Sequence, residues 1–597
     1  MTIHNKKYNF FDFIKIPFRS SPVLSAVRIT DKIIYALLPS FTALVTAGFV
    51  NTALEIFAGK QERQDIYIYL LFIMLIIAHQ TVNATLISFV TTKIKMKLSE
   101  SFKAAVVEKR AKLDYRHIED NDTWDIINRT CEDPAARIYN GFDHTLRIFD
   151  MFIRVGSLLI ILFGQVWWAG IAIILFSVPL FWLSVKSGKS NYEAFKNAAQ
   201  HERRARYMHE VLTGREYVDE RTMFGYTDKL NQKWFDKFET ARKINLYAQL
   251  KNYIRTRGGG SLTVIIWLGI VGVLIAPLGT GELTAGMFIG LSAASFSLVQ
   301  MVSWEFMYVT SEMANNNEYL KDLSRFSALS EQVGALDLPF CESIGFEKLE
   351  FINVNFKYPG TEKYILQNCS FVIEKNRHYA FVGINGAGKT TITKLLTSLY
   401  SDFEGQILID GKELSEYPQA RLKSIFTVVY QDFAKYYISI RDNIMLGDIN
   451  NIDNASNNQA EQAAELINLL PVIDALPYKL DTNLGKIKEN SVDLSGGEWQ
   501  RVAIARTLAN SAPVRILDEP TAVLDPIAES NMYEMFGKIS TGKTTVFITH
   551  RLGAAKLADE IFVIDNGSIA EQGPHTELIS RNGIYAQMFE SQRSWYI

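Results

Sequence analysis

Long stretches without charged residues are concentrated in the first half of this 597-residue chain. Three contain no Asp, Glu, Lys or Arg and a fourth is interrupted only by Glu282; they are Ile33–Leu54, Ile66–Thr92, Val155–Val185 and Gly258–Trp304. About twenty apolar residues cross the hydrocarbon core of a bilayer once. The first two stretches therefore predict single spans, and the two longer ones predict helix pairs that divide near Gly164 and Gly279. We expect a helical domain over residues 1–330 with six spans, at about 33–54, 66–92, 140–163, 166–186, 258–279 and 283–304.

The distribution of Lys and Arg predicts the orientation of these spans. The segments Lys93–Arg154 and Lys186–Arg257 carry 12 and 16 such residues, whereas Glu55–Asp65 has only Lys60 and Arg63. Because positive residues are enriched on the cytoplasmic side, we expect both basic segments and both chain termini in the cytosol. The polar residues within the spans, His79, Gln80, Asn83 and Gln300, indicate either a cavity or hydrogen bonds between helices.

Composition excludes two other kinds of site. A net charge of −2 and a pI near 6.5 offer no basic surface for nucleic acid. The three cysteines, Cys131, Cys341 and Cys369, are too far apart to match a metal-binding pattern.

A glycine-rich loop follows a predicted strand in the second half of the chain. The strand His378–Val382 leads into GINGAGKT at residues 383–390, and a helix is expected from Thr390. This strand–loop–helix order is the context that a phosphate-binding loop requires. Backbone amides of the loop and the helix N-terminus would surround the phosphates.

Each residue of the loop has an expected part in binding ATP. Lys389 would neutralise the β- and γ-phosphates, and the Thr390 hydroxyl would ligate Mg²⁺. The glycines keep side chains away from the phosphates. The other residues expected to contact ATP are Gly383, Ile384, Asn385, Gly386, Ala387, Gly388 and Thr391.

The run LSGGEWQ at residues 494–500 gives the loop a specific context. It is followed by a short apolar strand, Val514–Leu517, that ends in Asp518 and Glu519. A carboxylate at the carboxyl end of such a strand faces the ligand crevice of an open α/β sheet. With these three features, the chain resembles the ATP-binding cassette (ABC) family, in which LSGG closes over ATP held by a second cassette.

The resemblance implies a fold and an activity. The fold would be an all-α six-helix transmembrane domain followed by an α/β P-loop NTPase cassette, in a dimeric exporter architecture. A linker is expected at residues 331–345 and the cassette at 346–597. The protein would be an ATP hydrolase coupled to transport, in a bacterial plasma membrane. Its motifs are complete, so a homodimer is expected, while a heterodimer with another half-transporter stays open.

The same resemblance assigns roles within the cassette. Asp518 would hold Mg²⁺ through water, Glu519 would be the general base, and His550 in FITHR would contact the γ-phosphate. Tyr358 matches the family's aromatic residue that stacks on adenine, and Gln431 matches the glutamine that senses Mg²⁺ and the attacking water. Asp525 matches the aspartate of the segment that crosses the dimer interface. The signature residues that would contact the second ATP are Ser495, Gly496 and Gly497.

Two further features concern packing and coupling. Arg515 departs from the family pattern, in which this strand is apolar throughout, and indicates unusual local packing. The basic segments resemble cytoplasmic helical extensions, each ending in a short coupling helix on a cassette. The expected coupling helices are Asn121–Ile127, anchored by Trp124, and Tyr217–Phe224, anchored by Phe224.

Details of the cassette resemble exporters of lantibiotics such as nisin and subtilin. The similar segments are QDFAKYYISIRDNIMLGD at 431–448, the signature with Trp499, and LDPIAE at 524–529. The expected cargo is therefore a ribosomally made, modified peptide, and membrane lipid surrounds the spans. A multidrug or lipid exporter is the alternative, and a membrane sensor or ATP-gated channel shares this architecture.

Overall fold

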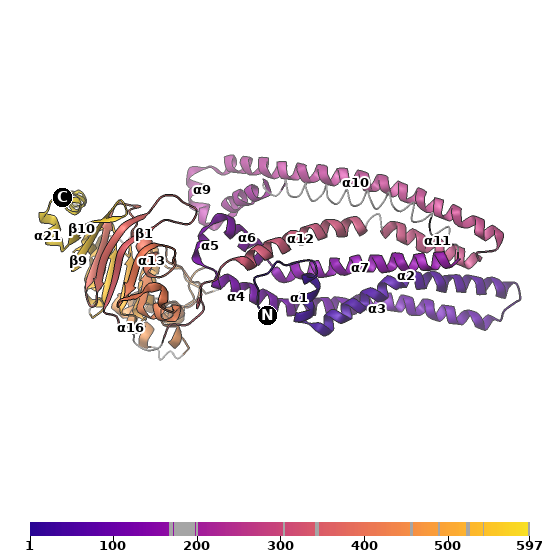
Figure 1. Ribbon diagram of the computed structural model, residues 1–597, viewed down its shortest axis with the longest axis horizontal. Helices are drawn as coiled ribbons and strands as arrows, with labels where there is room; N and C mark the ends of the chain where they lie inside the picture. Colours follow the sequence, from indigo (N-terminus) through magenta and orange to yellow (C-terminus); the bar gives the residue numbers. More distant parts are fainter. Residues whose placement is uncertain are drawn as a thin grey trace. The chain divides into compact units, whose positions relative to one another are not determined.

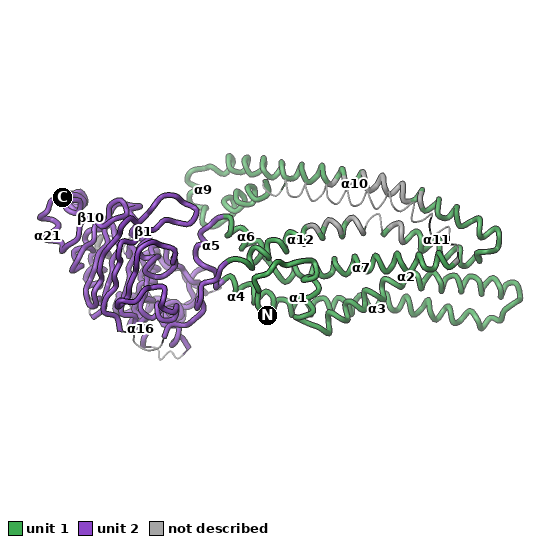
Figure 2. The backbone as a smooth tube through the Cα atoms, viewed as in Figure 1, with its two compact units in different colours: residues 1–110, 122–329 green, residues 111–121, 330–597 purple. Residues whose placement is uncertain are grey.

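The computed structural model describes all residues except 166, 168–170, 172–197, 199–200, 302–304, 341–344, 454–457, 487–489, 521–525, 541 and 595–597. Figure 2 shows two compact units, one formed by Met1–Arg110 with Asp122–Leu329, the other by Ala111–Asn121 with Ser330–Ile597. The first is helical and the second contains two β-sheets. The predicted fold class, a helical domain followed by an α/β cassette, is confirmed.

The first unit consists of long helices joined by short connections (Figure 1). Its described helices are α1 Asp12–Ser20, α2 Pro22–Phe57, α3 Ile66–Leu98, α4 Ala104–Lys112, α6 Asn121–Cys131, α7 Pro134–Gln165, α9 Val218–Phe224, α10 Thr227–Thr280, α11 Ala285–Gln300 and α12 Phe306–Ala328. A π-helical turn, Ser99–Lys103, joins α3 to α4, and the short 3₁₀ turns Arg63–Asp65 and Arg215–Tyr217 precede α3 and α9.

Five of the six predicted spans fall on these helices. Two described segments, Pro22–Phe57 and Arg63–Lys112, are long and apolar enough to cross a membrane, and shorter apolar helices lie at Trp267–Thr280 and Ala285–Ser297. The predicted span 166–186 lies almost entirely outside the described residues. The predicted division near Gly279 falls between α10 and α11, where Gly281 adopts the left-handed conformation (φ 79°) that ends α10.

Helix α2 is the central element of the first unit, since it packs against α3, α7 and α11. Two glycines of α11 permit its close approach to α2. A Cβ on Gly286 would lie 2.2 Å from the Ala47 carbonyl oxygen, and one on Gly290 would lie 2.4 Å from that of Ala43. Small residues let helix backbones approach closely, as is common between membrane helices.

The second unit is built on a six-stranded sheet with the order β10-β9-β3-β8-β7-β6. All neighbouring pairs are parallel except the antiparallel pair of β9 and β10. The strands are β3 His378–Gly383, β6 Phe426–Val429, β7 Val514–Asp518, β8 Thr544–Ile548, β9 Glu560–Asp565 and β10 Ser568–Gly573.

A smaller antiparallel sheet has the order β2-β1-β4-β5. Its strands are β1 Lys348–Phe356, β2 Leu366–Glu374, β4 Glu404–Ile409 and β5 Lys412–Glu413. Beside the sheets, the unit contains α5 Tyr115–Glu119, α13 Lys389–Leu396, α14 Gln419–Ile425, α15 Ile440–Met445, α16 Asn458–Leu466, α17 Leu470–Asp474, α18 Gly496–Leu508, α19 Pro526–Ile539, α20 Leu552–Ala555, α21 His575–Ser580 and α22 Ile584–Arg593, with 3₁₀ turns at Leu414–Glu416, Leu446–Asn451 and Lys479–Asp481.

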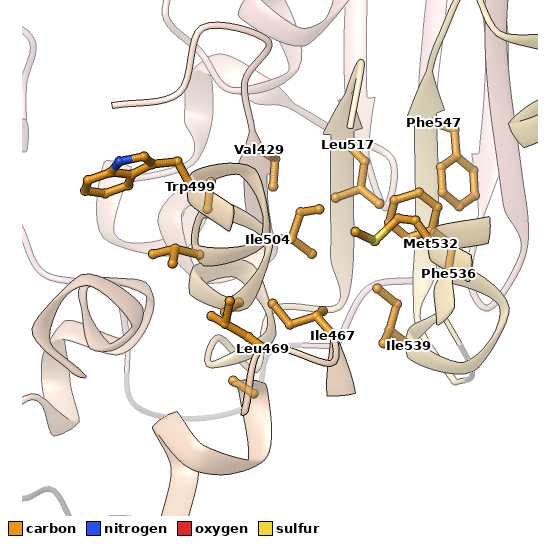
Figure 3. Close-up of a cluster of buried hydrophobic side chains, with 14 of the residues drawn as sticks. Val429, Ile467, Leu469, Trp499, Ile504, Leu517, Met532, Phe536, Ile539 and Phe547 are labelled. Carbon is orange, nitrogen blue, oxygen red and sulfur yellow. The ribbon is translucent and has the colours of Figure 1, made fainter. Parts of the chain in front are cut away.

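Apolar side chains from helices on one side of the large sheet form one core of this unit (Figure 3). Ile504 of α18, Leu517 of β7 and Phe547 of β8 belong to this core. Trp499 on α18 is 2% exposed and belongs to the same core. The signature helix is therefore fixed to the strand that carries the two acidic residues.

Arg515 is a buried cation within β7, 4% exposed. Its Nη1 donates a 2.6 Å hydrogen bond to the carbonyl oxygen of Ile539, the last residue of α19. The C-terminus of a helix carries a partial negative charge, which favours a cation there. Burial lowers the pKa of Arg515 to about 10. The residue that departs from the family pattern thus joins β7 to the helix that follows the 521–525 segment.

Candidate functional site

The parallel strands bring four separate segments to one edge of the large sheet. Ile548 of β8 pairs with Asp518 of β7 on one side and with Phe381 of β3 on the other. The phosphate loop follows β3, Gln431 follows β6 by two residues, and His550 follows β8 by two. Because all these strands run in the same direction, the predicted catalytic and phosphate-binding residues meet at this edge.

The phosphate loop has the backbone that its glycines permit. Gly386 and Gly388 have φ values of 82° and 107°, a backbone conformation that residues other than glycine rarely adopt. Helix α13 begins at Lys389, one residue before the predicted start. The loop amides and this helix N-terminus together form a site suited to phosphate.

Lys389 points back into its own loop. Its Nζ donates hydrogen bonds of 2.9 and 3.1 Å to the carbonyl oxygens of Gly383 and Ile384. Burial lowers the pKa of Lys389, while the charges of Glu519 and Asp518 oppose that shift. The ammonium therefore lies in a low-dielectric site between acidic residues and the loop, where an added phosphate would be strongly attracted.

Asp518 is the most deeply buried acid of the site, 1% exposed. Both of its carboxylate oxygens are buried. Burial raises the pKa of Asp518 to about 6, and the nearby Glu519 charge adds to the shift. The Thr390 side chain is a hydrogen-bonding neighbour that partly offsets this pKa shift. Two buried carboxylate oxygens beside the Thr390 hydroxyl and the phosphate loop fit a hard divalent cation such as Mg²⁺, which binds oxygen ligands.

Glu519 and His550 form a pair at the edge of the sheet. The distance between Glu519 Oε1 and His550 Nδ1 is 2.9 Å. Glu519 has a φ of 47°, an uncommon conformation for a residue other than glycine, and such backbone strain clusters at functional sites. The Gln500 side chain, from the signature helix, donates a 3.3 Å hydrogen bond to the Glu519 carbonyl.

Gln592 on α22 is a supporting residue that sequence reasoning missed. Its amide donates to the His550 carbonyl, and its Oε1 accepts a 3.0 Å hydrogen bond from the Leu552 amide. The side chain thus fixes both sides of the His550 turn. No local pattern marks a glutamine 42 residues away from its partner.

The signature run forms the N-terminus of α18. Ser495 is the N-cap and makes a reciprocal capping box with Glu498, with bonds of 2.8 and 3.4 Å. Helix α18 begins at Gly496, inside the signature run. Trp499 donates a 3.1 Å hydrogen bond from its indole to Asp493, and this bond lowers the pKa of that carboxyl.

Tyr358 lies in a cluster of aromatic rings beside the phosphate-loop helix. Its hydroxyl is 3.0 Å from the Thr391 hydroxyl, and its ring centroid is 5.5 Å from that of Tyr400. The ring also lines a cavity of about 960 Å³ in this unit. The remaining predicted interface residue, Asp525, lies outside the described residues.

The predicted first coupling helix, Asn121–Ile127, falls on α6, and all of it except Asn121 belongs to the helical unit. The neighbouring segment Ala111–Asn121, which contains α5, belongs to the cassette unit. The Trp124 ring lies 5.1 Å from the Arg110 guanidinium. Polar and aromatic contacts hold α5 in the cassette unit.

Those contacts lead from α5 to the nucleotide-site residues. Glu119 forms an ion pair with Lys394 and accepts a hydrogen bond from the Tyr400 hydroxyl. Burial alone would raise the pKa of Glu119, but Lys394 and Tyr400 hold it below the usual value. Since Tyr400 also packs against Tyr358, one cluster connects α5 with the predicted adenine-stacking residue.

Two family models match separate parts of the chain. The description "ABC transporter transmembrane region" covers residues 32–302, and "ABC transporter" covers residues 366–522. The first falls within the helical unit, and the second spans the phosphate loop, the signature and the two acidic residues.

Similar proteins extend over nearly the whole chain. The subtilin transport ATP-binding protein of Bacillus subtilis is 28% identical over 94% of this chain and 90% of its own length. The nisin transport ATP-binding protein of Lactococcus lactis subsp. lactis is 29% identical over 97% of this chain and 95% of its own. The ATP-dependent lipid A-core flippase of Pseudomonas putida is 29% identical over 87% of this chain and 84% of its own.

A solved structure shows the same fold. It is a bacterial Atm1-family ABC exporter with ATP bound, and it superimposes with a TM-score of 0.76 at 23% identity. The match covers 94% of this chain and 98% of that one.

Replacement of Glu519 by Gln tests the predicted base. The variant keeps the size and most of the hydrogen-bonding capacity of the side chain but cannot take a proton from water. We expect ATP hydrolysis to fall by roughly 10²–10⁴-fold while ATP binding persists, as measured by phosphate release and nucleotide binding on purified protein. Lys389→Ala is the contrasting variant, because losing the cation should weaken ATP binding itself. Hydrolysis by Glu519→Gln at the wild-type rate would instead favour His550 as the base.

The raised pKa of Asp518 predicts a pH-dependent stability without nucleotide. An acid with a raised folded-state pKa contributes stability that is fully present below its unfolded pKa, near 4, and is lost as the pH rises through about 6. Asp518→Asn mimics the protonated form, so it should raise the melting temperature by a few degrees at pH 7.5, for a gain of up to about 3 kcal/mol. The gain should shrink toward pH 5.

Thermal unfolding of the full chain in detergent from pH 5 to 8 measures this effect. The exposed acid Asp402 provides the control variant, Asp402→Asn, which should melt like the wild type throughout. A melting temperature for Asp518→Asn at or below that of the wild type at pH 7.5 would contradict the expectation that the buried, ionised carboxylate of Asp518 destabilises the folded protein.

Proposed function

The chain belongs to the ABC transporter family, and we propose that it exports a ribosomally made, modified peptide from the cytosol, driven by ATP hydrolysis. One observation carries the peptide assignment: subtilin and nisin transport proteins match it over 94% and 97% of its length. The lipid A-core flippase supports the alternative, a lipid or multidrug exporter, because it has similar identity over 87% of the chain. The transport experiment below separates these two functions.

In the proposed reaction, ATP binds with its phosphates on the loop and its base near Tyr358. Lys389 exchanges its bonds to the loop carbonyls for contacts with the β- and γ-phosphates, because phosphate offers it a full negative charge. The aromatic cluster around Tyr358 gives the base a surface on which to stack. Both contacts lie within one cassette.

Hydrolysis requires an oriented water and a place for its proton. Glu519 would accept the proton at its carboxylate as the water oxygen attacks the γ-phosphorus. His550, 2.9 Å from Glu519, would hold the carboxylate in position and contact the γ-phosphate. Thr390, Gln431 and Asp518 would hold Mg²⁺, which supplies positive charge to the phosphates when bound.

The proposed active form is a dimer of this chain in the plasma membrane, with both termini in the cytosol. One chain offers one phosphate loop and one signature, and Ser495, Gly496 and Gly497 would complete the ATP site of the partner. The capping box holds Ser495 at the end of a 13-residue helix, where hydroxyl and amide groups suit a phosphate. A closed two-fold dimer satisfies both sites equally.

Cross-linking tests this assembly. Cysteines placed at Ala387 and Ser495 should cross-link between two copies when ATP is bound, in a strain that makes only this chain. The cysteine at Ser495 alone serves as the control and should give no such product. Absence of the product, with ATPase activity that appears only after a second half-transporter is added, would establish a heterodimer.

Transport into inside-out vesicles tests the cargo. We expect ATP-dependent accumulation of a modified peptide encoded near this gene, and no accumulation with vesicles that contain Glu519→Gln. A fluorescent phospholipid and a cationic dye are assayed in parallel. Movement of lipid or dye, without the peptide, would replace peptide export by the alternative function, and peptide binding without transport would support a sensor.

A further inference from the structure

A pocket of about 320 Å³ lies among the helices of the membrane unit. Helix α2 lines one side of it, α11 lines another, and single residues of α3 and α7 complete it; the lining residues are Tyr35, Leu38, Pro39, Thr42, Ala43, Thr46, Gln80, Arg154, Gly290, Ala293, Ala294 and Ser297. Its volume is at the lower end of the range for small-molecule pockets, so it suits the end of a larger molecule.

Arg154 is the single charged side chain among these lining residues. It is 9% exposed and lies on α7, and a charge buried to this extent is costly unless it has partners. Its Nη2 donates a 2.9 Å hydrogen bond to Asp150, and its Nη1 lies 3.8 Å from Glu305. Neither acid lines the pocket, and Arg154 Nε has no hydrogen-bond partner among the described residues.

The rest of the lining combines apolar surface with neutral polar groups. Pro39 has no amide hydrogen to donate to the Tyr35 carbonyl one turn earlier in α2. The Tyr35 ring lies 5.3 Å from the Arg154 guanidinium and holds it by a cation–π contact. Gly290 and the alanines of α11 keep one wall small and apolar.

From this arrangement we propose that the pocket binds the anionic group at one end of an amphipathic substrate. In the peptide export proposed above, on which this assignment rests, the group is a terminal carboxylate next to apolar side chains. A guanidinium binds carboxylate or phosphate through parallel hydrogen bonds, and the low dielectric strengthens the attraction. A cationic group would meet Arg154 with no acid on the pocket lining to offset it.

The test compares two forms of one probe on purified full-length protein in detergent. The probe is a short apolar peptide with a neutral fluorophore at its amino end and either a free carboxylate or an amide at its carboxyl end. Fluorescence anisotropy should show the carboxylate form bound about tenfold more tightly, or better. Equal affinities in the wild-type protein would overturn the proposal.

Variants of Arg154 separate charge recognition from folding. Arg154→Gln alone leaves Asp150 unpaired, so the double variant Arg154→Gln with Asp150→Asn is the main test, and it should lose the preference for carboxylate. Arg147→Gln is the matched control, since Arg147 is on the same helix, pairs with Asp143 at 2.9 Å and does not line the pocket. It should keep the preference. A double variant that still prefers the carboxylate overturns the proposal.

Filling the pocket provides an independent measurement. Ala293→Leu adds bulk to the pocket wall and changes no charge, so both forms of the peptide should bind more weakly. Unchanged binding of both forms would place the peptide elsewhere and overturn the proposal.

A phosphate-bearing probe distinguishes failure of the pocket from failure of the peptide function. A short-chain phosphatidic acid is compared with the matching diacylglycerol in the same proteins. If the phosphatidic acid binds in an Arg154-dependent way and no peptide binds, the anion pocket is supported and peptide export is overturned in favour of lipid.

Discussion

The parallel pairing of β3, β8, β7 and β6 is the constraint on which the cassette depends. It places the ends of four strands in one row, so that residues more than a hundred positions apart in sequence meet at one edge. A shift in the β7–β8 register would move Asp518 away from Ile548 and separate Glu519 from His550. The buried packing of α18 against β7 links the same strand to the signature.

Buried charged side chains occur both in the candidate nucleotide site and in the pocket of the membrane unit. Asp518 and Lys389 lie in surroundings that disfavour their charged forms, and the phosphates and a cation would relieve that strain. In the membrane unit, Arg154 is held by Asp150 and Tyr35 in an apolar wall. Burial strengthens the electrostatic attraction of these side chains for an opposite charge, so a small number of them can bind strongly.

Trp499 shows how a sequence resemblance and a physical role differ. It supported the narrower likeness to lantibiotic exporters, yet its side chain is buried in the cassette core and bonds to Asp493. Such a residue constrains the packing of the signature helix. The proposed peptide cargo therefore rests on similarity along the whole chain, and the proposed anion pocket around Arg154 is a separate argument about cargo chemistry.

The sequence by itself determined the fold class, the order of the two units and the identity of the motif residues, because each depends on local signals: apolar length, glycine spacing and an acidic pair at a strand end. It identified Arg515 as unusual without revealing its partner, the Ile539 carbonyl. Only the tertiary structure decided that α5 belongs to the cassette unit, that Gln592 holds the His550 turn, and that Arg154, paired with Asp150, lines a pocket of the membrane unit. These are contacts between distant segments, and they follow from how the strands and helices pack, which no local pattern records.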